Sequence, residues 1–281
     1  MNLVIGKNGF IAKQLALRSE YIYTTSIKSD ESSLYFDLNY PELFNYSILN
    51  KGTTILMLAA ISSPDECRNN FEKAYRINVA GTKTFIKKAL ERQARVLFFS
   101  SDVVYGNTET EVDENSATDP IGPYATMKNE IEKIFENEPN FKVFRLSYVL
   151  SSQDKYLSYL KSCQEKSQVA EVFHPFYRKV IYIEDVIKAI EYIIHNWDMF
   201  KNQKFNICGV DQISRKDIAD YFNAAIKNDP LNYITVKPND SFWESRPKYI
   251  DVTSIYLKVL LGRAPTPISD AVNEIIKNIE K

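Results

Sequence analysis

The feature that most constrains the fold of this chain is an alternation of short apolar runs with longer segments of helical period. Runs of strand length, such as Thr54–Leu58 and Val96–Ser100, are separated by segments in which apolar residues recur every three or four positions. A strand that returns parallel to its predecessor needs a long crossover, usually a helix. The order therefore predicts an α/β fold, a doubly wound parallel sheet with helices on both faces.

The individual elements follow from this period and from the turn residues between the runs. Strands are expected at Leu3–Ile5, Tyr21–Thr25, Leu34–Asp37, Thr54–Leu58, Val96–Ser100, Lys142–Leu146, Val180–Ile183 and Lys204–Cys208. Helices are expected at Phe10–Leu17, Asn70–Arg92, Tyr124–Glu136, Tyr156–Glu165, Glu184–His195, Arg215–Ile226, Thr253–Leu261 and from Ile268 onward. After Ser151 the regular alternation weakens, and we expect the chain to shuttle between two lobes.

The composition narrows the class of protein. The formal net charge is -1 and no polybasic tract occurs, so we expect neither nucleic acid nor a membrane surface as a partner. No apolar run is long enough to span a bilayer and no signal peptide is visible, which predicts a cytoplasmic protein. Cys67, Cys163 and Cys208 are predicted to be free buried thiols, and with only His174 and His195 besides we expect no transition-metal site.

A glycine-rich turn follows the first expected strand: Gly6-Lys7-Asn8-Gly9-Phe10-Ile11-Ala12. In such a turn Gly6 permits a tight reversal, Gly9 lets the backbone approach a pyrophosphate, and Ala12 lets helix and strand pack closely. Glycines also turn strands into helices without any ligand. The position between the first strand and an amphipathic helix nevertheless favours a Rossmann-type dinucleotide site.

The end of the second strand bears on the choice of nicotinamide cofactor. An Asp or Glu there would bind the ribose 2′-hydroxyl of NAD and repel a 2′-phosphate. This chain has Tyr23-Thr24-Thr25-Ser26 instead, followed by Lys28. The hydroxyls and the nearby cation slightly favour NADP(H) over NAD(H), although Lys28 can equally be a solvated loop charge.

Tyr124 and Lys128 form the sharpest chemical signal. Residues four apart share one helix face, and a cation beside the phenol would lower its pKa from about 10 toward neutrality, where it can exchange a proton. In a chain with 18 tyrosines this spacing also arises by chance. Ser100 and Ser101 strengthen the signal, because they end an expected strand at the sheet edge where ligands bind and a hydroxyl can meet a carbonyl oxygen.

Several further motifs occur in order along nearly the whole chain. Besides the glycine turn and Tyr124/Lys128 they are Leu58-Ala59-Ala60, Asn78-Val79-Ala80-Gly81-Thr82, Ser100-Ser101-Asp102-Val103-Val104-Tyr105-Gly106 and Arg145-Leu146-Ser147. Together they resemble the extended short-chain dehydrogenase/reductases that modify nucleotide sugars, the NAD-dependent epimerase/dehydratase family. The resemblance implies an NAD(P)-dependent oxidoreductase with a Rossmann domain at residues 1–150, to which about 178–210 return, and a smaller substrate-binding lobe formed mainly by 151–281.

The resemblance also implies roles for particular residues. Ser101, Tyr124 and Lys128 would be catalytic, with Lys128 also holding the nicotinamide ribose. The cofactor would be bound by Gly6, Asn8, Gly9, Phe10, Ile11, Asp37, Leu38, Leu58, Ala59, Ala60, Asn78, Ser100, Tyr124 and Lys128. From the residues alone, Asp37 could equally cap a helix and Asn78 could satisfy a buried backbone group.

Two arginines match positions that contact the sugar-nucleotide diphosphate in this family, Arg178 before an acidic helix start and Arg246 before Pro247. A forked guanidinium suits phosphate oxygens. The alternative is a structural ion pair, for example Arg246 with Glu244. The acidic residues Glu184 and Asp185 are expected to cap a helix.

The residues after Ser101 bear on the reaction. Related dehydratases carry an Asp-Glu pair there, whereas this chain has Asp102-Val103, and no cysteine is expected beside the triad as in GDP-fucose synthases. The pattern is closest to the dTDP-4-dehydrorhamnose reductase-like branch, and it implies reduction of a dTDP-, GDP- or UDP-4-keto-6-deoxy sugar in deoxysugar or surface-polysaccharide synthesis. Asp102 would orient a sugar hydroxyl or cap the turn. The alternatives are a 4-epimerase with tightly bound NAD and a non-catalytic NAD(P)-binding protein.

By analogy with the family we also expect a homodimer. Relatives pair through two helices that correspond here to Asn70–Arg92 and Tyr124–Glu136.

Overall fold

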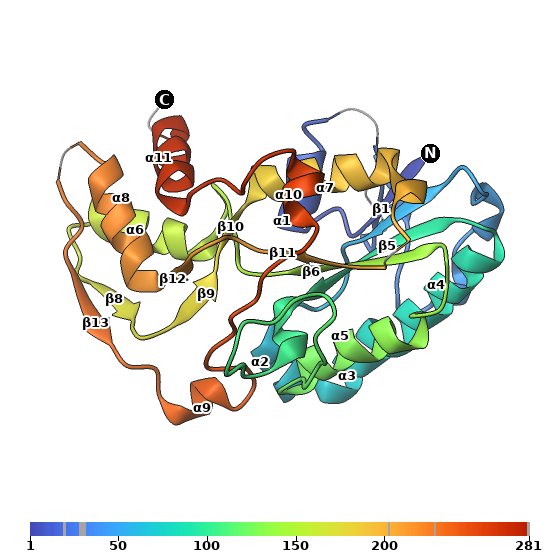
Figure 1. Ribbon diagram of the computed structural model, residues 1–281, viewed down its shortest axis with the longest axis horizontal. Coiled ribbons are helices and arrows are strands. Elements are labelled where there is room, and N and C mark those ends of the chain that lie inside the picture. The colour runs from blue at the N-terminus through green and yellow to red at the C-terminus, as the bar shows by residue number, and fades with distance from the viewer. Residues whose placement is uncertain (19–20, 28–31, 202, 228, 280–281) are drawn as a thin grey trace.

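A seven-stranded parallel sheet forms the centre of the computed structural model, which describes residues 1–18, 21–27, 32–201, 203–227 and 229–279 (Figure 1). The strand order is β11-β6-β5-β4-β1-β2-β3. The strands are β1 Asn2–Ile5, β2 Tyr21–Thr25, β3 Leu34–Tyr35, β4 Thr54–Met57, β5 Arg95–Ser101, β6 Phe141–Leu146 and β11 Lys204–Ile207. The predicted doubly wound α/β fold is confirmed.

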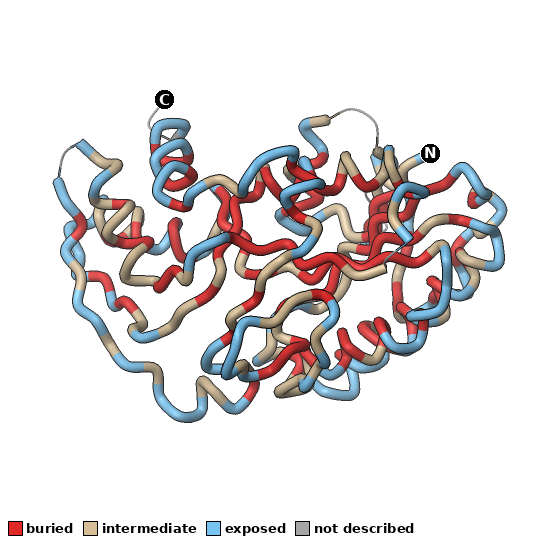
Figure 2. The backbone as a smooth tube through the Cα atoms, in the orientation of Figure 1, coloured by how far each residue is buried: buried red, intermediate tan, exposed pale blue. Residues whose placement is uncertain are grey.

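Helices cover both faces of this sheet. On one face lie α1 (Phe10–Leu15), α7 (Ile183–His195) and α10 (Leu257–Leu261), and on the other α2 (Pro64–Asn69), α3 (Phe71–Tyr75), α4 (Thr82–Glu91) and α5 (Pro123–Ile134). Side chains of neighbouring strand residues point to opposite faces of the sheet, so Val4 belongs to one apolar core and Leu3 to the other. Figure 2 shows the buried strands between the exposed outer surfaces of the helices.

The predicted single helix Asn70–Arg92 is wrong in detail. The chain runs through α3, a π-helical stretch Arg76–Gly81 and α4. The carbonyl oxygen of Leu38 lies against Gly81 so closely that a Cβ there would be 2.0 Å from it. Thr82 Oγ1 donates a hydrogen bond of 3.0 Å to the Ile77 carbonyl inside the widened turn. The helix therefore changes its winding where the end of the β3 region touches it.

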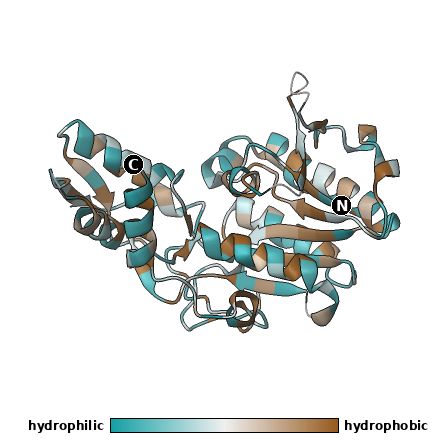
Figure 3. Ribbon diagram, turned by 90° about the horizontal axis from the view of Figure 1, so that it is seen from above, coloured by the Kyte–Doolittle hydropathy of each residue, from teal (hydrophilic) through white to brown (hydrophobic). Residues whose placement is uncertain are grey.

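A smaller lobe stands beside the sheet, as the view from above in Figure 3 makes plain. It contains the helices α6 (Lys155–Glu165), α8 (Arg215–Ala225) and α11 (Ile268–Ile279) and the strand pairs β8 (Ala170–Phe173) with β13 (Tyr233–Val236) and β9 (Tyr177–Lys179) with β12 (Gln212–Ser214). The short strands β7 (Val149–Leu150) and β10 (Ile181–Tyr182) connect it to the sheet, and α9 (Asp240–Trp243) lies at the bottom of the view in Figure 1.

Two predicted boundaries were wrong in this region. Ile183 begins α7 and does not extend the strand, which ends at Tyr182. The helix predicted from Thr253 starts only at Leu257, because Thr253 donates its N–H to the Val112 carbonyl and is held in extended backbone. Ser254 then accepts a hydrogen bond from the Leu257 N–H at the start of α10.

Candidate active site

The glycine turn between β1 and α1 has the conformation that the sequence requires. Gly6 has a φ of +101°, and a Cβ on it would lie 3.1 Å from the Ala59 backbone nitrogen. Gly9 differs, because a Cβ there would meet only the Gly6 carbonyl at an ordinary 3.6 Å. The turn of the described structure thus needs glycine at Gly6 for its own packing, whereas the space beside Gly9 suits a ligand that approaches the backbone.

The residues around this turn are placed by polar contacts between loops. Asn78 accepts from the Ile61 N–H and donates to the Ile61 carbonyl, at 3.0 and 2.9 Å, and so fixes the loop that carries Ala59 and Ala60. These contacts match the structural alternative for Asn78, in which its side chain satisfies buried backbone groups. Asp37 accepts from the backbone and side chain of Asn39, which caps a turn, not a helix.

The other predicted cofactor residues differ in exposure. Asn8 and Phe10 are exposed, and Ile11 and Leu38 are buried in the apolar cores. Leu58 is partly buried, and Ser100 is buried with a hydroxyl that has no hydrogen-bond partner in the described part of the chain. An open backbone at Gly9 and an orphaned hydroxyl at the strand end fit a dinucleotide that lies across the sheet edge. Lys28 lies outside the described residues.

Tyr124 and Lys128 lie on the first two turns of α5, whose first residue is Pro123. Gly122 precedes it with a φ of +82° and allows the chain to enter the helix at this point. The Lys128 Nζ lies 5.9 Å from the centroid of the Tyr124 ring and donates a 2.7 Å hydrogen bond to the Phe99 carbonyl. The two side chains share a helix face, as the spacing predicts.

The predicted effect of Lys128 on Tyr124 is wrong for the protein as it stands. Burial raises the pKa of Tyr124 above its ordinary value, and the neighbouring acidic groups Cys67 and Asp102 raise it further. Burial also lowers the pKa of Lys128, to about 8. The sequence suggested a tyrosine poised near neutrality, but desolvation exceeds the effect of a lysine whose ammonium is directed at Phe99.

Ser101 ends β5 and is joined to its neighbour. Its hydroxyl donates to Asp102 Oδ1 at 3.1 Å and accepts from the Val103 N–H at 3.4 Å, so Ser101, not Asp102, caps the turn. Asp102 is 3% exposed, and burial raises the pKa of its carboxyl although Arg178 and Ser147 act against this. Asp102 therefore contacts a ligand only through Ser101 or after a local shift.

Arg178 is buried, and its guanidinium is already bonded to main-chain carbonyls. Its Nη1 donates to Tyr177 and Lys248, and its Nη2 donates to Pro247 at 2.7 Å. Burial lowers the pKa of Arg178 to about 10, while Asp102 opposes that shift. These contacts connect β9 to the segment after Arg246.

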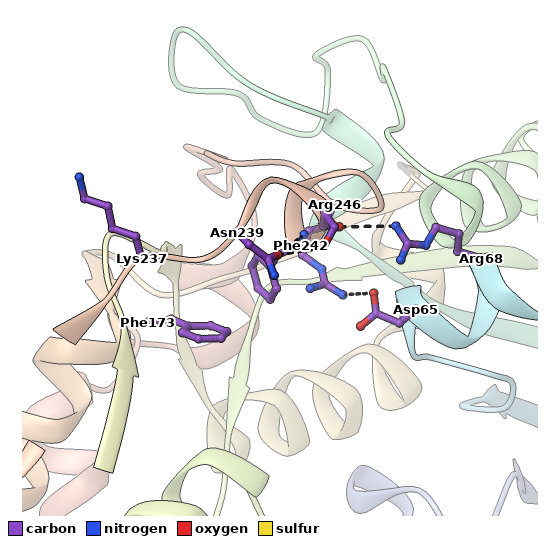
Figure 4. Close-up of a pocket in the computed structure, with 8 residues that line it drawn as sticks. Asp65, Arg68, Phe173, Lys237, Asn239, Phe242 and Arg246 are labelled. Atoms are coloured by element: carbon purple, nitrogen blue, oxygen red, sulfur yellow. Dashed lines mark hydrogen bonds and ion pairs between the residues drawn. The ribbon is translucent and has the colours of Figure 1, made fainter. Parts of the chain in front are cut away.

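Arg246 lines a cavity of about 350 Å³ between α2 and the smaller lobe, together with Asp65, Arg68, Phe173, Lys237, Asn239, Ser241 and Phe242 (Figure 4). Its Nη2 lies 2.7 Å from Asp65 Oδ1, and its guanidinium lies 4.1 Å from the centroid of the Phe242 ring. The ion pair with Glu244, weighed from the sequence, does not form. Glu244 pairs with Arg68 instead, at 2.7 Å.

This cavity adjoins the helix that carries Tyr124 without including that residue. The Ser245 carbonyl lies so close to Gly122 that a Cβ there would be 2.7 Å from it. Gly122 directly precedes α5. The arginine-lined cavity is thus only a few residues along the chain from Tyr124 and Lys128.

Comparison with known proteins settles the family. The model of the RmlD substrate binding domain matches residues 1–281. The chain belongs to this family. It is accordingly a member of the extended short-chain dehydrogenase/reductases, as the motifs indicated.

Individual relatives of this RmlD-family chain are distant. It is 26% identical over 217 residues to ADP-L-glycero-D-manno-heptose-6-epimerase of Brachyspira hyodysenteriae, covering 70% of this chain and 67% of that protein. It is 36% identical over 84 residues to UDP-glucose 4-epimerase of Halalkalibacterium halodurans, covering 29% of this chain and 25% of the relative.

Solved structures share the fold over the full length. MoeE5 in complex with UDP-glucose and NAD superposes with a TM-score of 0.80 at 18% identity, covering 100% of this chain and 99% of the other. A UDP-glucose-4-epimerase from Stenotrophomonas maltophila with bound NAD gives 0.78 at 15% identity, covering 99% and 98%. Such low identities support the fold alone.

Cys67 was missed as a neighbour of the site. From the sequence, no cysteine was expected beside Ser101, Tyr124 and Lys128, yet Cys67 is near enough to raise the pKa of both Tyr124 and Lys128. It lies on α2, where Asn78 Nδ2 is 3.7 Å from its sulfur. Only the folding of α2 against α5 brings it there. As predicted, Cys67, Cys163 and Cys208 are all free and buried.

Glu184 and Asp185 at the start of α7 were expected to cap this helix, but both bind residues of other segments. Glu184 accepts from Gln14 and Arg18 of the first helix region. Asp185 is fully buried and binds Arg263 and Thr266. Among the residues that the structure describes, no cluster of His, Cys, Asp and Glu could hold a metal ion, and no helix is long and apolar enough to cross a membrane.

Proposed function

We propose that this RmlD-family protein reduces the keto group at C4 of a nucleotide-linked sugar. The observation that carries the proposal is the pairing of Ser101 with Asp102, near a partly buried Tyr124 and a cation-lined cavity. Val103 stands where a dehydratase would need an acid, and its apolar side chain cannot remove a proton. The relatives named for nucleotide sugars support this substrate class.

A bound nicotinamide would supply the hydride. A hydroxyl has one proton to donate, and in this structure Ser101 donates it to Asp102 Oδ1. To hold the keto oxygen, Ser101 would turn this proton from Asp102 toward the substrate. Tyr124 keeps its proton at neutral pH, since burial raises its pKa, and a protonated phenol is the form that must donate to the alkoxide as it develops. Lys128 provides positive charge below its pKa of about 8 and compensates the tyrosinate that remains.

We propose NADPH as the preferred donor over NADH. The described end of β2 has no carboxylate that would repel a 2′-phosphate, and Ser26 there is exposed, whereas Thr24 and Thr25 are buried. Quenching of protein fluorescence by each cofactor gives the two dissociation constants. Tighter binding of NADH would contradict the preference.

The activity is tested with a panel of 4-keto nucleotide sugars by following the absorbance of NADPH and NADH. We expect stoichiometric cofactor oxidation, with kcat lower by about 10²- to 10⁴-fold in Tyr124→Phe. Tyr221→Phe, on α8, removes the same hydroxyl elsewhere and should leave the rate unchanged. Full activity of Tyr124→Phe would remove this residue from the mechanism.

A 4-epimerase is the second candidate, because both sequence relatives described above are named as epimerases. The same three side chains would act, but NAD would stay bound and be regenerated in each cycle. Interconversion of 4-epimers without net consumption of cofactor would favour this candidate over the reductase. Copurification of NAD with the protein would point the same way.

We further propose a cytoplasmic homodimer that pairs through α3 and α5. Phe71, Tyr75 and Ile134 on these helices are 45%, 37% and 38% exposed, which is unusual for large apolar side chains on one face. Light scattering measures the mass directly. A monomer at micromolar concentration would refute the dimer.

A further inference from the structure

Two ion pairs join α2 to the segment at α9. Asp65 and Arg68, three residues apart on α2, bind Arg246 and Glu244 respectively, both at 2.7 Å. Figure 4 shows the pair of Asp65 with Arg246. The two pairs have opposite polarity. The acid Asp65 of α2 binds the base Arg246, and the base Arg68 of α2 binds the acid Glu244. Asp65 Oδ1 also accepts from Ser245 at 3.1 Å. The hydrogen bond from Arg246 is the main cause that lowers the pKa of Asp65, which is therefore ionised at neutral pH.

The cavity itself is suited to a polyanion with a flat ring. Three of its lining side chains are cations, Arg68, Lys237 and Arg246, and Asp65 is the single acidic residue among those that line it. Phe173 and Phe242 add aromatic faces. Arg246 is 12% exposed and stacked on Phe242, which keeps its guanidinium in place for a forked contact with oxygens.

The carboxylate of Asp65 occupies on Arg246 the place that a phosphate oxygen would need. It presents an anionic oxygen at hydrogen-bond distance from Nη2, as a phosphate would. The Asp65 side chain is 53% exposed, so it can turn into solvent at little cost. Asp65 and a bound diphosphate cannot both neutralise Arg246 at this position, and like charges side by side repel.

We propose that Asp65 is an internal competitor for the phosphate subsite, which a nucleoside diphosphate displaces from Arg246 on binding. The proposal rests on the proposed function, because it takes Arg246 as the residue that receives the diphosphate. Asp65 sets the affinity of the site, and its release uncouples α2 from the 245–246 segment when ligand arrives. Asp65 tunes affinity here and takes no part in the chemistry.

The test is calorimetric titration of UDP and dTDP into protein saturated with NADP⁺, so that the proposed cofactor site is filled. Asp65→Asn keeps the size of the side chain and removes its charge, and Asp65→Ser repeats the charge removal in case one variant folds poorly. Because exposed ion pairs are weak, we expect both variants to bind the diphosphates about two- to fivefold more tightly. In turnover, KM for the nucleotide sugar should fall by a similar factor while kcat stays unchanged.

The matched control is Asp198→Asn. Asp198 pairs with Arg95 at 2.6 Å, is 83% exposed and lies outside the residues that line the cavity, so the same charge and the same type of pair are removed elsewhere. Its affinity for UDP and dTDP should equal that of the unaltered protein. Equal or weaker binding by the Asp65 variants would overturn the proposal, because a purely structural aspartate would loosen the 245–246 segment when removed.

Arg246→Gln separates this inference from the proposed function. We expect it to weaken diphosphate binding at least about tenfold, as for the loss of a hydrogen bond to a charged group. If Arg246→Gln weakens binding and Asp65→Asn leaves it unchanged, the competitor role of Asp65 is wrong and the substrate site stands. If Arg246→Gln binds as tightly as the unaltered protein, the phosphate site itself is misplaced and both proposals fall.

Discussion

Replacing Lys128 by methionine should stabilise the protein while abolishing its activity. Lys128 is 7% exposed, and burial lowers its pKa from 10.5 to about 8. A depressed lysine pKa means that the folded state disfavours the ammonium. The drop corresponds to about 3 kcal/mol of destabilisation at pH 7. Methionine keeps the apolar stem but leaves the Phe99 carbonyl without its hydrogen bond, which costs about 1 to 2 kcal/mol. The net gain for Lys128→Met is about 1 to 2 kcal/mol.

The sign of the pH dependence provides a second readout. Between pH 8 and 10.5 the unfolded chain binds more protons at this lysine than the folded one, so the stability of the unaltered protein rises with pH in that window. Lys128→Met lacks this dependence. The advantage of the variant should therefore shrink by about 2 kcal/mol from pH 7 to pH 9.5.

Urea unfolding followed by circular dichroism at pH 7, 8, 9 and 9.5 measures both effects. Lys142→Met is the matched control, since burial also lowers the pKa of Lys142 to about 8 and this lysine lies away from Tyr124, donating to the Phe200 carbonyl. The control should show a similar convergence with pH but retain activity. A stability difference between Lys128→Met and the unaltered protein that does not change from pH 7 to 9.5 would refute the buried-ammonium argument.

Three further changes test other parts of the structure. Gly9→Ala should leave the free energy of unfolding within about 0.5 kcal/mol but weaken cofactor binding measured by fluorescence, because only a ligand needs the space there. Gly81→Ala should destabilise by more than about 2 kcal/mol in urea unfolding, since its Cβ would collide with the Leu38 carbonyl. Glu132→Gln should cost about 3 kcal/mol in the same assay, because the Arg145 guanidinium, 2% exposed, would lose its bidentate partner.

The parts of the site that sequence predicted correctly are those set by local chain geometry. The positive φ at Gly6 follows from a turn of a few residues, and the shared face of Tyr124 and Lys128 follows from the helical period. The sheet could be predicted for a similar reason, since apolar runs of strand length separated by helices admit few arrangements.

The parts that sequence missed depend on contacts between distant segments. Asp65 and Arg246 are 181 positions apart, and opposite charges at that separation give no local signal. The raised pKa of Tyr124 is likewise a consequence of burial, which pattern alone does not measure. The sequence does contain one hint. In both segments an acidic residue shortly precedes an arginine, Asp65 before Arg68 and Glu244 before Arg246.

Residues 245–248 connect the cavity at Arg246 to the helix that carries Tyr124. The Ser245 carbonyl packs on Gly122, which directly precedes the helix of Tyr124, and the next residue along the chain is Arg246 in the cavity. The carbonyls of Pro247 and Lys248 hold Arg178, whose charge acts on Asp102 beneath Ser101. A diphosphate bound at Arg246 would thus be positioned relative to Tyr124 by a few rigid backbone contacts. Arg178 fixes this segment, because its buried guanidinium is bonded to three carbonyls and to no carboxylate in the part of the chain described.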